Sequence, residues 1–313
     1  MKTDKKLWTA VILLPITILI MAAAIASSLS TASAAGNIPI AQEIEAETYV
    51  EIPIEIELQA MDTDNDIVLY QLTEEPRLGT ANIQGNILSY SPGAKAGKDK
   101  LSYTAVDAEG NTAKATQITI QVQKNRAKLT YSDMVDNPAH YAAIYLAEKG
   151  IMTGESIGGC SFFRPTQTVT RSEFIAMAAS VAELPIEPTE QTDFADDAGL
   201  SPWAKPFVST AAASGLVNGY QTTGGLNEIR GQNPITLAEA SVIINNLLSE
   251  SMDGLQYTLA DTHGDMDWAR SAISSLDRLD ILSPLTTMQG DDSPITRQDA
   301  CEMLYRAMRL MQK

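Results

Sequence analysis

The chain has 313 residues, of which 44% are hydrophobic, so it is long enough for two or three units with their own cores and is not disordered overall. Its formal net charge of −17 makes it a poor candidate for binding nucleic acid or an anionic membrane, because both require Lys and Arg patches. Its two cysteines, Cys160 and Cys301, are too few for a disulfide-stapled scaffold. Spacing alone leaves open one bridge or two free thiols, and we favour two free, buried thiols.

Residues 1–35 have the pattern of a secretory signal peptide. Three lysines lie in the first six residues, an apolar run follows at Leu7–Ala26, and Ala32-Ser33-Ala34 forms a small-residue cleavage site. The apolar run is also near the minimum for a membrane span, so an uncleaved anchor is the alternative. The cleavage site and Pro15 favour removal of the segment. We therefore expect the rest of the chain to be exported, with no membrane contact beyond the signal segment.

Residues 37–124 show the alternation of a β module. Short runs of β-forming residues are separated by clusters of Gly, Pro, Asn and Asp, which predicts an antiparallel sandwich. The expected strands are Tyr49–Leu58, Ile67–Leu72, Ala81–Ile83, Ile87–Tyr90, Lys100–Val106 and Ala115–Val122. Phrases such as Leu88-Ser89-Tyr90-Ser91-Pro92 and Val106-Asp107-Ala108-Glu109-Gly110-Asn111 resemble bacterial cadherin-like or immunoglobulin-like modules.

Three aspartates in this module, Asp62, Asp64 and Asp66, are candidate calcium ligands. Calcium prefers several hard oxygen ligands, which carboxylates supply. The stretch lacks the glycine and the distal glutamate of an EF-hand loop. An acidic turn is the favoured alternative, because turns select Asp and Asn for backbone reasons.

Three stretches in the remaining residues predict the same kind of helix start. Each has an apolar residue, then a Thr, then an acid three residues later. The Thr hydroxyl can accept a backbone N–H at the N-cap, and the acid can accept the N-cap N–H in return. The stretches are Val169-Thr170-Arg171-Ser172-Glu173, Ile235-Thr236-Leu237-Ala238-Glu239 and Ile295-Thr296-Arg297-Gln298-Asp299. Three such starts at spacings of 66 and 60 residues indicate an internal repeat.

The repeat has three units, which we place at residues 125–190, 191–250 and 251–313. Each unit predicts a helix, a turn, a loop and a second, capped helix, and repeats of this size must pack together to bury their apolar faces. The turn carries two glycines in the first two units. The expected helices are Tyr141–Lys149, Arg171–Ala182, Trp203–Ser214, Leu237–Leu248, Trp268–Leu279 and Arg297–Met311.

These units resemble S-layer homology domains. The resemblance rests on an opening aromatic-x-Asp, Trp-Ala in the first helix, a Gly-Ile-x-x-Gly turn and a Thr-Arg-Ala-Glu helix start. It implies an all-α bundle of three repeats with grooves between them. It also implies non-covalent attachment of an exported protein to an anionic cell-wall polysaccharide, often a polymer with pyruvate ketals, or to modified peptidoglycan in some bacteria.

Arg171 and Arg297 are the strongest candidates for binding such a polysaccharide. Each occupies the first position of a capped helix, where a guanidinium could bind an acid group beside backbone N–H groups. Helix capping favours acids at this position, so capping does not explain the two arginines. The second repeat has Leu237 in the same place.

Trp203 and Trp268 are candidates for stacking on a sugar ring, and Gly154 and Gly219 would let the backbone approach a ligand closely. Core packing of the tryptophans and helix termination by the glycines are the structural alternatives. The first repeat has no Trp and the third lacks both turn glycines, so no repeat carries the full pattern.

The sequence therefore favours an exported, non-catalytic protein that is anchored at the cell wall, with the β module as a spacer or adhesive module. An enzyme in the β module is a weaker hypothesis, because both histidines, His140 and His263, lie in the repeats. A third hypothesis is a structural surface-layer or assembly protein whose repeats bind peptidoglycan, copies of the chain or another surface protein. No cofactor is expected apart from the candidate calcium ion.

Overall fold

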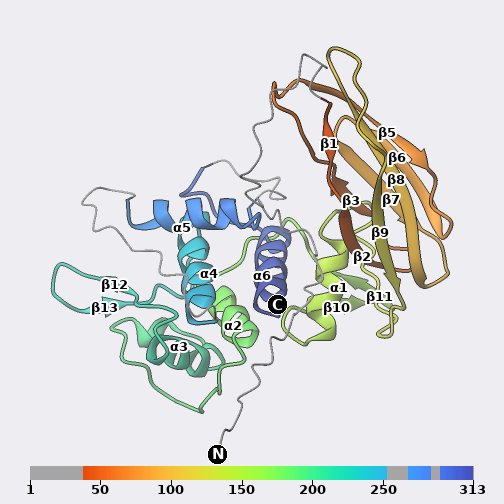
Figure 1. The fold of residues 1–313 in the computed structure, drawn as a ribbon. Coiled ribbons are helices and arrows are strands. Elements are labelled where there is room, and N and C mark those ends of the chain that lie inside the picture. The colour runs from red at the N-terminus through yellow and green to blue at the C-terminus, as the bar shows by residue number, and fades with distance from the viewer. Residues whose placement is uncertain (1–37, 252–266, 283–289, 313) are drawn as a thin grey trace, which may run out of the picture. The chain divides into compact units, whose positions relative to one another are not determined.

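A computed structural model of the protein describes residues 38–251, 267–282 and 290–312. The predicted signal segment and the opening phrase of the third repeat lie outside these residues. The chain divides into a first unit, formed by residues up to 48 and residues 56–123, and a second unit, formed by residues 49–55 and 124–312. Figure 1 shows strands in the first unit and helices in most of the second. In the described part of the chain, no helix is both long and apolar enough to cross a membrane.

The β module is built from strands in two main sheets, in which β5–β8, β8–β9 and β6–β7 pair antiparallel. A four-stranded sheet has the order β2-β9-β8-β5, a three-stranded sheet has the order β3-β7-β6, and β1 pairs with β4. The strands are β1 (Ile40–Ala41), β2 (Ile44–Tyr49), β3 (Ile54–Glu57), β4 (Ala60–Met61), β5 (Ile67–Glu74), β6 (Gly79–Gln84), β7 (Ile87–Pro92), β8 (Gly97–Asp107) and β9 (Thr116–Gln123). Alternate side chains such as Leu101, Tyr103, Ile118 and Ile120 are fully buried, as period-two patterning predicts.

The expected single strand at Tyr49–Leu58 is wrong. The chain turns between β2 and β3, where Glu51 has a φ of 62° and the N–H of Ile52 donates to the carbonyl of Tyr49 at 3.2 Å. Pro53 has no N–H for a sheet ladder, which also disfavours a continuous strand here. The alternation of apolar and acidic residues therefore continues through a turn.

The second unit contains helices and short hairpins, so the expectation of an all-α region is corrected. The helices are α1 (His140–Glu148), α2 (Arg171–Val181), α3 (Ala204–Ala213), α4 (Leu237–Ser251), α5 (Asp267–Arg278) and α6 (Arg297–Met311), with a short 3-10 turn at Asp197–Gly199. Strands β10 (Glu155–Ile157) and β11 (Cys160–Phe162) form one hairpin, and β12 (Tyr220–Gln221) and β13 (Asn227–Glu228) form another. Each hairpin lies between the two helices of its repeat.

The helices interlock between repeats. The three helices with capped starts, α2, α4 and α6, contact one another. Each of them also packs against the first helix of a different repeat. Helix α3 packs on α2, α5 packs on α4, and α1 packs on α6. Each first helix thus rests on the second helix of another repeat, and the pattern closes into a ring.

A cycle of backbone hydrogen bonds joins the residues just before the three capped starts. The N–H of Ile235 donates to the carbonyl of Val169 at 2.9 Å, that of Ile295 to Ile235 at 3.0 Å, and that of Val169 to Ile295 at 3.3 Å. All three side chains are buried. The three apolar positions that precede the Thr residues therefore form the centre of the ring.

The segment Tyr49–Glu55 belongs to the second unit. The Tyr49 hydroxyl donates to Oε2 of Glu148 at 2.6 Å, and the Tyr49 and Tyr141 rings lie 5.0 Å apart. Tyr49 and Ile52 are each 2% exposed and join the core of this unit. A fragment that begins at residue 125 would therefore lack part of its core.

Both cysteines are free thiols. Cys301 is buried, and burial raises its pKa well above the usual value. Cys160 is exposed, so the expectation that both are buried is wrong for this residue. It lies in β11, a hairpin strand whose residues are exposed or half-buried.

Candidate ligand-binding site

The capped helix starts form as the sequence predicts. At Thr170 and Thr296 the hydroxyl accepts the N–H of the acid three residues later, and that acid accepts the N–H of the Thr. Thr236 and Glu239 make the same two bonds at 3.3 and 3.0 Å. The reciprocal bonds satisfy two backbone donors at each helix start.

The first two N–H groups of each of these helices are bonded to a turn of another repeat. This differs from the expectation that such groups would help to bind an acid group at Arg171 and Arg297. The donor and acceptor pairs are Arg171 to Asn233, Ser172 to Gly231, Leu237 to Ser293, Ala238 to Asp291, Arg297 to Gln167 and Gln298 to Pro165. The backbone N–H groups at these helix starts are therefore already used within the protein.

Arg171 is buried against the hairpin of the second repeat. Its guanidinium carbon lies 4.9 Å from the centroid of the Tyr220 ring, and its Nη1 lies 3.8 Å from Oε2 of Glu239. Nε of Arg171 is buried and has no hydrogen-bond partner among the described residues. An unpaired buried donor costs free energy, and this one is enclosed by its neighbours.

Arg230 approaches the same ring. Its guanidinium carbon lies 4.5 Å from the Tyr220 centroid, and its Nε pairs with Oε2 of Glu228 at 3.3 Å. The Tyr220 hydroxyl donates to Oε1 of Glu239, and burial raises the Tyr220 pKa above its usual value, so the phenol stays protonated. We call Arg171, Tyr220, Arg230 and Glu239 the Tyr220 site. Sequence reasoning missed Tyr220 and Arg230, although Tyr220 directly follows the turn glycine.

Arg297 has a different environment at the hairpin of the first repeat. Its Nε donates to the carbonyl of Phe163 and its Nη2 to the carbonyl of Thr153, each at 2.8 Å. Its guanidinium carbon also lies 4.9 Å from the Phe163 ring centroid. The Arg297 side chain therefore joins α6 to the first repeat through the protein's own backbone.

The turn glycines are required by the opening aromatic residues. A Cβ on Gly154 would overlap the Phe162 carbonyl and the Tyr131 ring, and one on Gly219 would lie 2.6 Å from the Phe194 ring. Close packing, which the sequence did not predict, therefore explains both glycines. In the third repeat Asp280 takes the left-handed turn with a φ of 57°, as Gly150 and Gly215 do in theirs.

The aspartates of the opening aromatic-x-Asp phrases also have a structural role. The Asp133 carboxylate accepts the N–H groups of Phe163 and Arg164, each at 2.8 Å. Asp196 accepts those of Ile229 and Arg230 at 2.9 and 2.8 Å. These bonds fix the turn that precedes the capped helix. In the second repeat they hold the backbone of Arg230 beside Tyr220.

Trp203 makes no cation–π contact with Arg171 or Arg297 in the described part of the chain. Trp203 is 50% exposed and makes an edge contact with Phe207, with ring centroids 6.5 Å apart. Its exposure is consistent with stacking on a sugar and disagrees with a core role. The Trp268 side chain lies outside what the structure describes.

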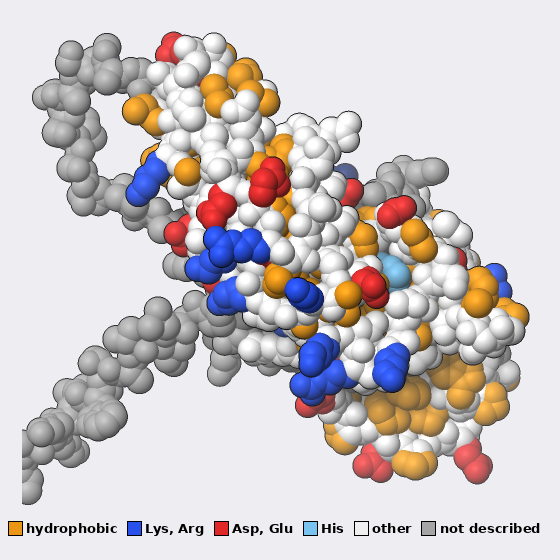
Figure 2. Space-filling model, turned by 90° about the vertical axis from the view of Figure 1, so that its right-hand side faces the viewer, with side chains coloured by type: hydrophobic (Ala, Val, Ile, Leu, Met, Phe, Trp, Pro, Cys, Tyr) orange, Lys and Arg blue, Asp and Glu red, His pale blue; other side chains and the backbone are white. Residues whose placement is uncertain are grey.

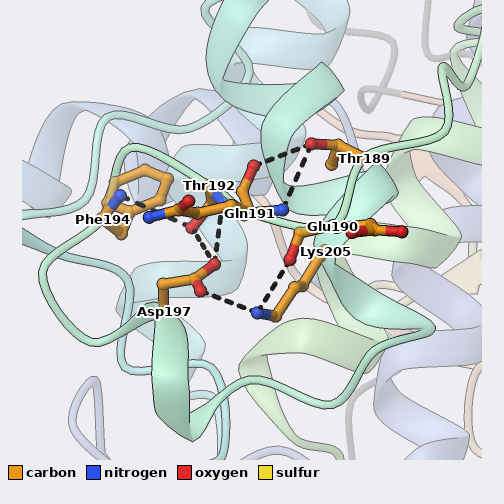
Figure 3. A network of polar contacts seen from close by, with 7 residues as sticks. All are labelled: Thr189, Glu190, Gln191, Thr192, Phe194, Asp197 and Lys205. Atoms are coloured by element: carbon orange, nitrogen blue, oxygen red, sulfur yellow. Dashed lines mark hydrogen bonds and ion pairs between the residues drawn. The ribbon is translucent and has the colours of Figure 1, made fainter.

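Lys205 and Asp197 hold the segment that leads into α3 (Figure 3). Nζ of Lys205 donates to Oδ2 of Asp197 at 2.7 Å and to the Glu190 carbonyl at 3.1 Å. Asp197 also accepts the N–H and hydroxyl of Thr192 at 2.7 and 2.9 Å. The bond from Lys205 contributes most, and together these bonds hold the pKa of Asp197 below its usual value. The network fixes the start of α3 close to Trp203.

His140 makes the first repeat sensitive to pH. It is 5% exposed, its Nε2 accepts the N–H of Tyr131 at 3.3 Å, and burial lowers its pKa. The unfolded chain then binds a proton that the folded chain does not, so stability is complete above the unfolded pKa of about 6.5 and falls as the pH drops below it. We expect a loss of at most about 1.4 kcal/mol per pH unit. Thermal unfolding between pH 7.5 and 5 should show a weaker pH dependence for His140→Gln than for the natural chain. Equal slopes would contradict this assignment.

The three aspartates that gather in the β module are not the three that the sequence predicted. One carboxylate oxygen from each of Asp62, Asp66 and Asp107 lies within 4.8 Å of the others, so Asp107 takes the place expected for Asp64. One oxygen of Asp62 and one of Asp66 are buried without a hydrogen-bond partner among the described residues. A hydrogen bond with Asp62 and its negative charge raise the pKa of Asp66.

Calcium binding by this group stays a prediction. Three carboxylates can supply the hard oxygen ligands that Ca²⁺ takes. We expect Ca²⁺ to raise the melting temperature of the β module in the natural chain and not in Asp66→Asn, measured by calorimetry after treatment with a chelator. An equal response of both proteins would remove Asp66 from the prediction.

Charges of both signs mix on one face of the protein. On the face drawn in Figure 2, Lys and Arg side chains are interspersed with Asp and Glu side chains. Such a mixture suits local recognition by individual arginines better than attraction of a polyanion over a wide area.

Comparisons with known families agree with this architecture. Residues 36–121 match the family model of the bacterial Ig domain, and residues 130–175 and 193–241 match that of the S-layer homology domain. The cadherin-like part of the expected resemblance and the third repeat are not among these matches.

Several known proteins match part of the chain. The chain is 25% identical over 181 residues to an S-layer protein of Bacillus thuringiensis subsp. finitimus, which covers 55% of this chain and 21% of that protein. It is 24% identical over 180 residues to the S-layer protein sap of Bacillus anthracis, covering 55% and 20%. A 126-residue segment is 33% identical to an amylopullulanase of Thermoanaerobacterium thermosulfurigenes, covering 39% of this chain and 6% of the enzyme. The chain thus spans about a fifth of the length of the S-layer relatives.

Together these findings indicate a cell-surface, cell-wall-anchored protein with one region that matches the bacterial Ig domain and two that match the S-layer homology domain. The matched domains and the S-layer relatives suggest a non-catalytic surface protein.

Proposed function

We propose that the three helix pairs are three S-layer homology repeats that hold the exported chain on an anionic cell-wall polysaccharide. The observation that carries this proposal is the position of the two arginines. Arg171 and Arg297 each begin a central helix and contact the turn or hairpin of another repeat. Each guanidinium thus stands at a junction between repeats, where a sugar acid such as a pyruvate ketal could reach it.

The third repeat is included for two reasons. Thr296 and Asp299 form the same reciprocal cap as the matched repeats, and Ile295 completes the backbone cycle with Val169 and Ile235. We assign residues 125–190, 191–250 and 251–313 to the repeats, residues 37–124 to the module that acts as a spacer or adhesive, and residues 1–35 to a signal peptide removed on export.

Co-sedimentation with purified cell-wall sacculi tests this function. The protein should comprise residues 36–313, because residues 49–55 are part of the helical unit. We expect it to bind intact sacculi and to lose binding once the secondary polymer is chemically stripped. Binding that survives stripping would identify peptidoglycan as the ligand. No binding to either would contradict anchoring and favour assembly with copies of the chain or with another surface protein.

A further inference from the structure

We propose that the Tyr220 site is the polysaccharide-binding site of the chain and that the corresponding site around Arg297 does not bind. This inference rests on the proposed anchoring function and chooses between the two junctions that carry an arginine. It makes Arg230 and Tyr220 binding residues beside Arg171.

The two junctions are built from corresponding residues. Tyr220 follows Gly219 and begins β12, and Glu155 follows Gly154 and begins β10. Arg230 and Arg164 both have left-handed backbones, with φ of 56° and 63°. In each case the N–H of the arginine and the N–H of the residue before it donate to the opening aspartate of the same repeat. The side chains of both arginines are 47% exposed. The sites can therefore be compared position by position.

The first difference is in the donors of the central arginine. Nε and Nη2 of Arg297 are already bonded to the carbonyls of Phe163 and Thr153. Arg171 has no such bond at Nε, although its side chain is only 8% exposed, and Glu239 lies at 3.8 Å from its Nη1. A guanidinium binds a carboxylate best through two parallel N–H groups. Arg297 has used two of its five donors on the chain itself, whereas Arg171 is enclosed by its neighbours and contributes its positive charge beside the Tyr220 ring.

The second difference is between an aromatic ring and an acid. At the Tyr220 site, the guanidiniums of Arg171 and Arg230 both lie against one ring. At the other site, Glu155 holds the corresponding position and pairs with Arg164 at 3.5 Å. A carboxylate in place of the ring repels an acidic sugar and offers no surface on which the sugar can stack. Tyr220 adds no charge, and its ring supplies a surface for a sugar.

The Glu228 partner of Arg230 does not close the Tyr220 site. The pair is solvent-exposed, with side chains 47% and 36% accessible, and exposed ion pairs contribute little to stability. An incoming carboxylate can therefore replace Glu228 at Arg230, and the positive charge of the buried Arg171 on the same ring adds to the attraction. The acidic group of the sugar would then lie at Arg230, beside the Tyr220 ring.

Matched substitutions test the assignment in the sacculus assay with residues 36–313. We expect Arg230→Gln to weaken binding about tenfold or more, the effect of losing one charged hydrogen bond. Its control, Arg164→Gln, changes the same residue type at the same exposure and backbone conformation, and should stay within about twofold. Tyr220→Glu should abolish binding, and Glu155→Tyr should leave it intact or strengthen it. Far-ultraviolet circular dichroism and the melting temperature check that each variant folds.

Two outcomes would overturn the inference. Equal loss of binding in Arg164→Gln and Arg230→Gln would mean that the junctions are equivalent, and loss in Arg164→Gln alone would move the site to Arg297. In both cases the natural chain still binds, so the anchoring function stands. If the natural chain binds neither intact nor stripped sacculi, the anchoring function fails and this inference fails with it.

Discussion

Ile235→Ala is expected to lower the free energy of unfolding by about 3 kcal/mol and to loosen all three repeats together. Ile235 is fully buried, and its backbone both donates to Val169 and accepts from Ile295 in the central cycle. Truncating the side chain opens a cavity where the three central helices meet. Because every first helix rests on the second helix of another repeat, the loss should not stay within one repeat.

Hydrogen exchange combined with chemical unfolding measures this effect. The N–H groups of α2, α4 and α6 should all lose protection in Ile235→Ala, in a single cooperative transition. Ile229→Ala is a matched control, because Ile229 is equally buried in the same repeat and lies outside the cycle. Open repeat arrays can unfold piece by piece. Separate transitions, or lost protection confined to residues 191–250, would show that the cycle does not couple the repeats.

Gly219→Ala is expected to cost about 3 kcal/mol of stability, with two physical causes. The left-handed backbone, with a φ of 73°, is unfavourable for alanine, and the new Cβ would lie 2.6 Å from the Phe194 ring and 2.8 Å from the Glu228 carbonyl. Gly154→Ala should lower stability by a similar amount, because the new Cβ overlaps its neighbours even without a left-handed backbone.

Two other glycines separate the causes. Gly225 has a φ of 78° with open space around it, so Gly225→Ala should cost only about 1 kcal/mol. Gly199 has neither a left-handed backbone nor a close neighbour, and Gly199→Ala should change stability by less than about 0.5 kcal/mol. Urea unfolding followed by circular dichroism would rank the variants. A Gly154→Ala protein as stable as Gly199→Ala would show that the opening aromatic residue does not require the glycine.

The sequence determined the features that depend on neighbours along the chain. The three capped starts appear at Thr170, Thr236 and Thr296, because a capping box needs only a hydroxyl and an acid three residues apart. The strands after residue 60 fall near their expected limits for the same reason, since alternation is a local signal. The failure at Tyr49–Leu58 arose where a turn kept the same alternation.

Only the tertiary structure decided which residues meet across the repeats. Nothing in the spacing shows that α1 packs on α6 or that Tyr220 and Arg230 gather at Arg171, because these partners come from different repeats and their positions depend on the packing of whole helices. Helix packing also gave the helix-start N–H groups to neighbouring turns. In the β module, the pairing of β5 with β8 brought Asp107 to Asp62 and Asp66. The sequence therefore singled out Arg171 and Arg297 as candidates, and the fold decided that Arg297 bonds to the backbone of another repeat while Arg171 packs against Tyr220.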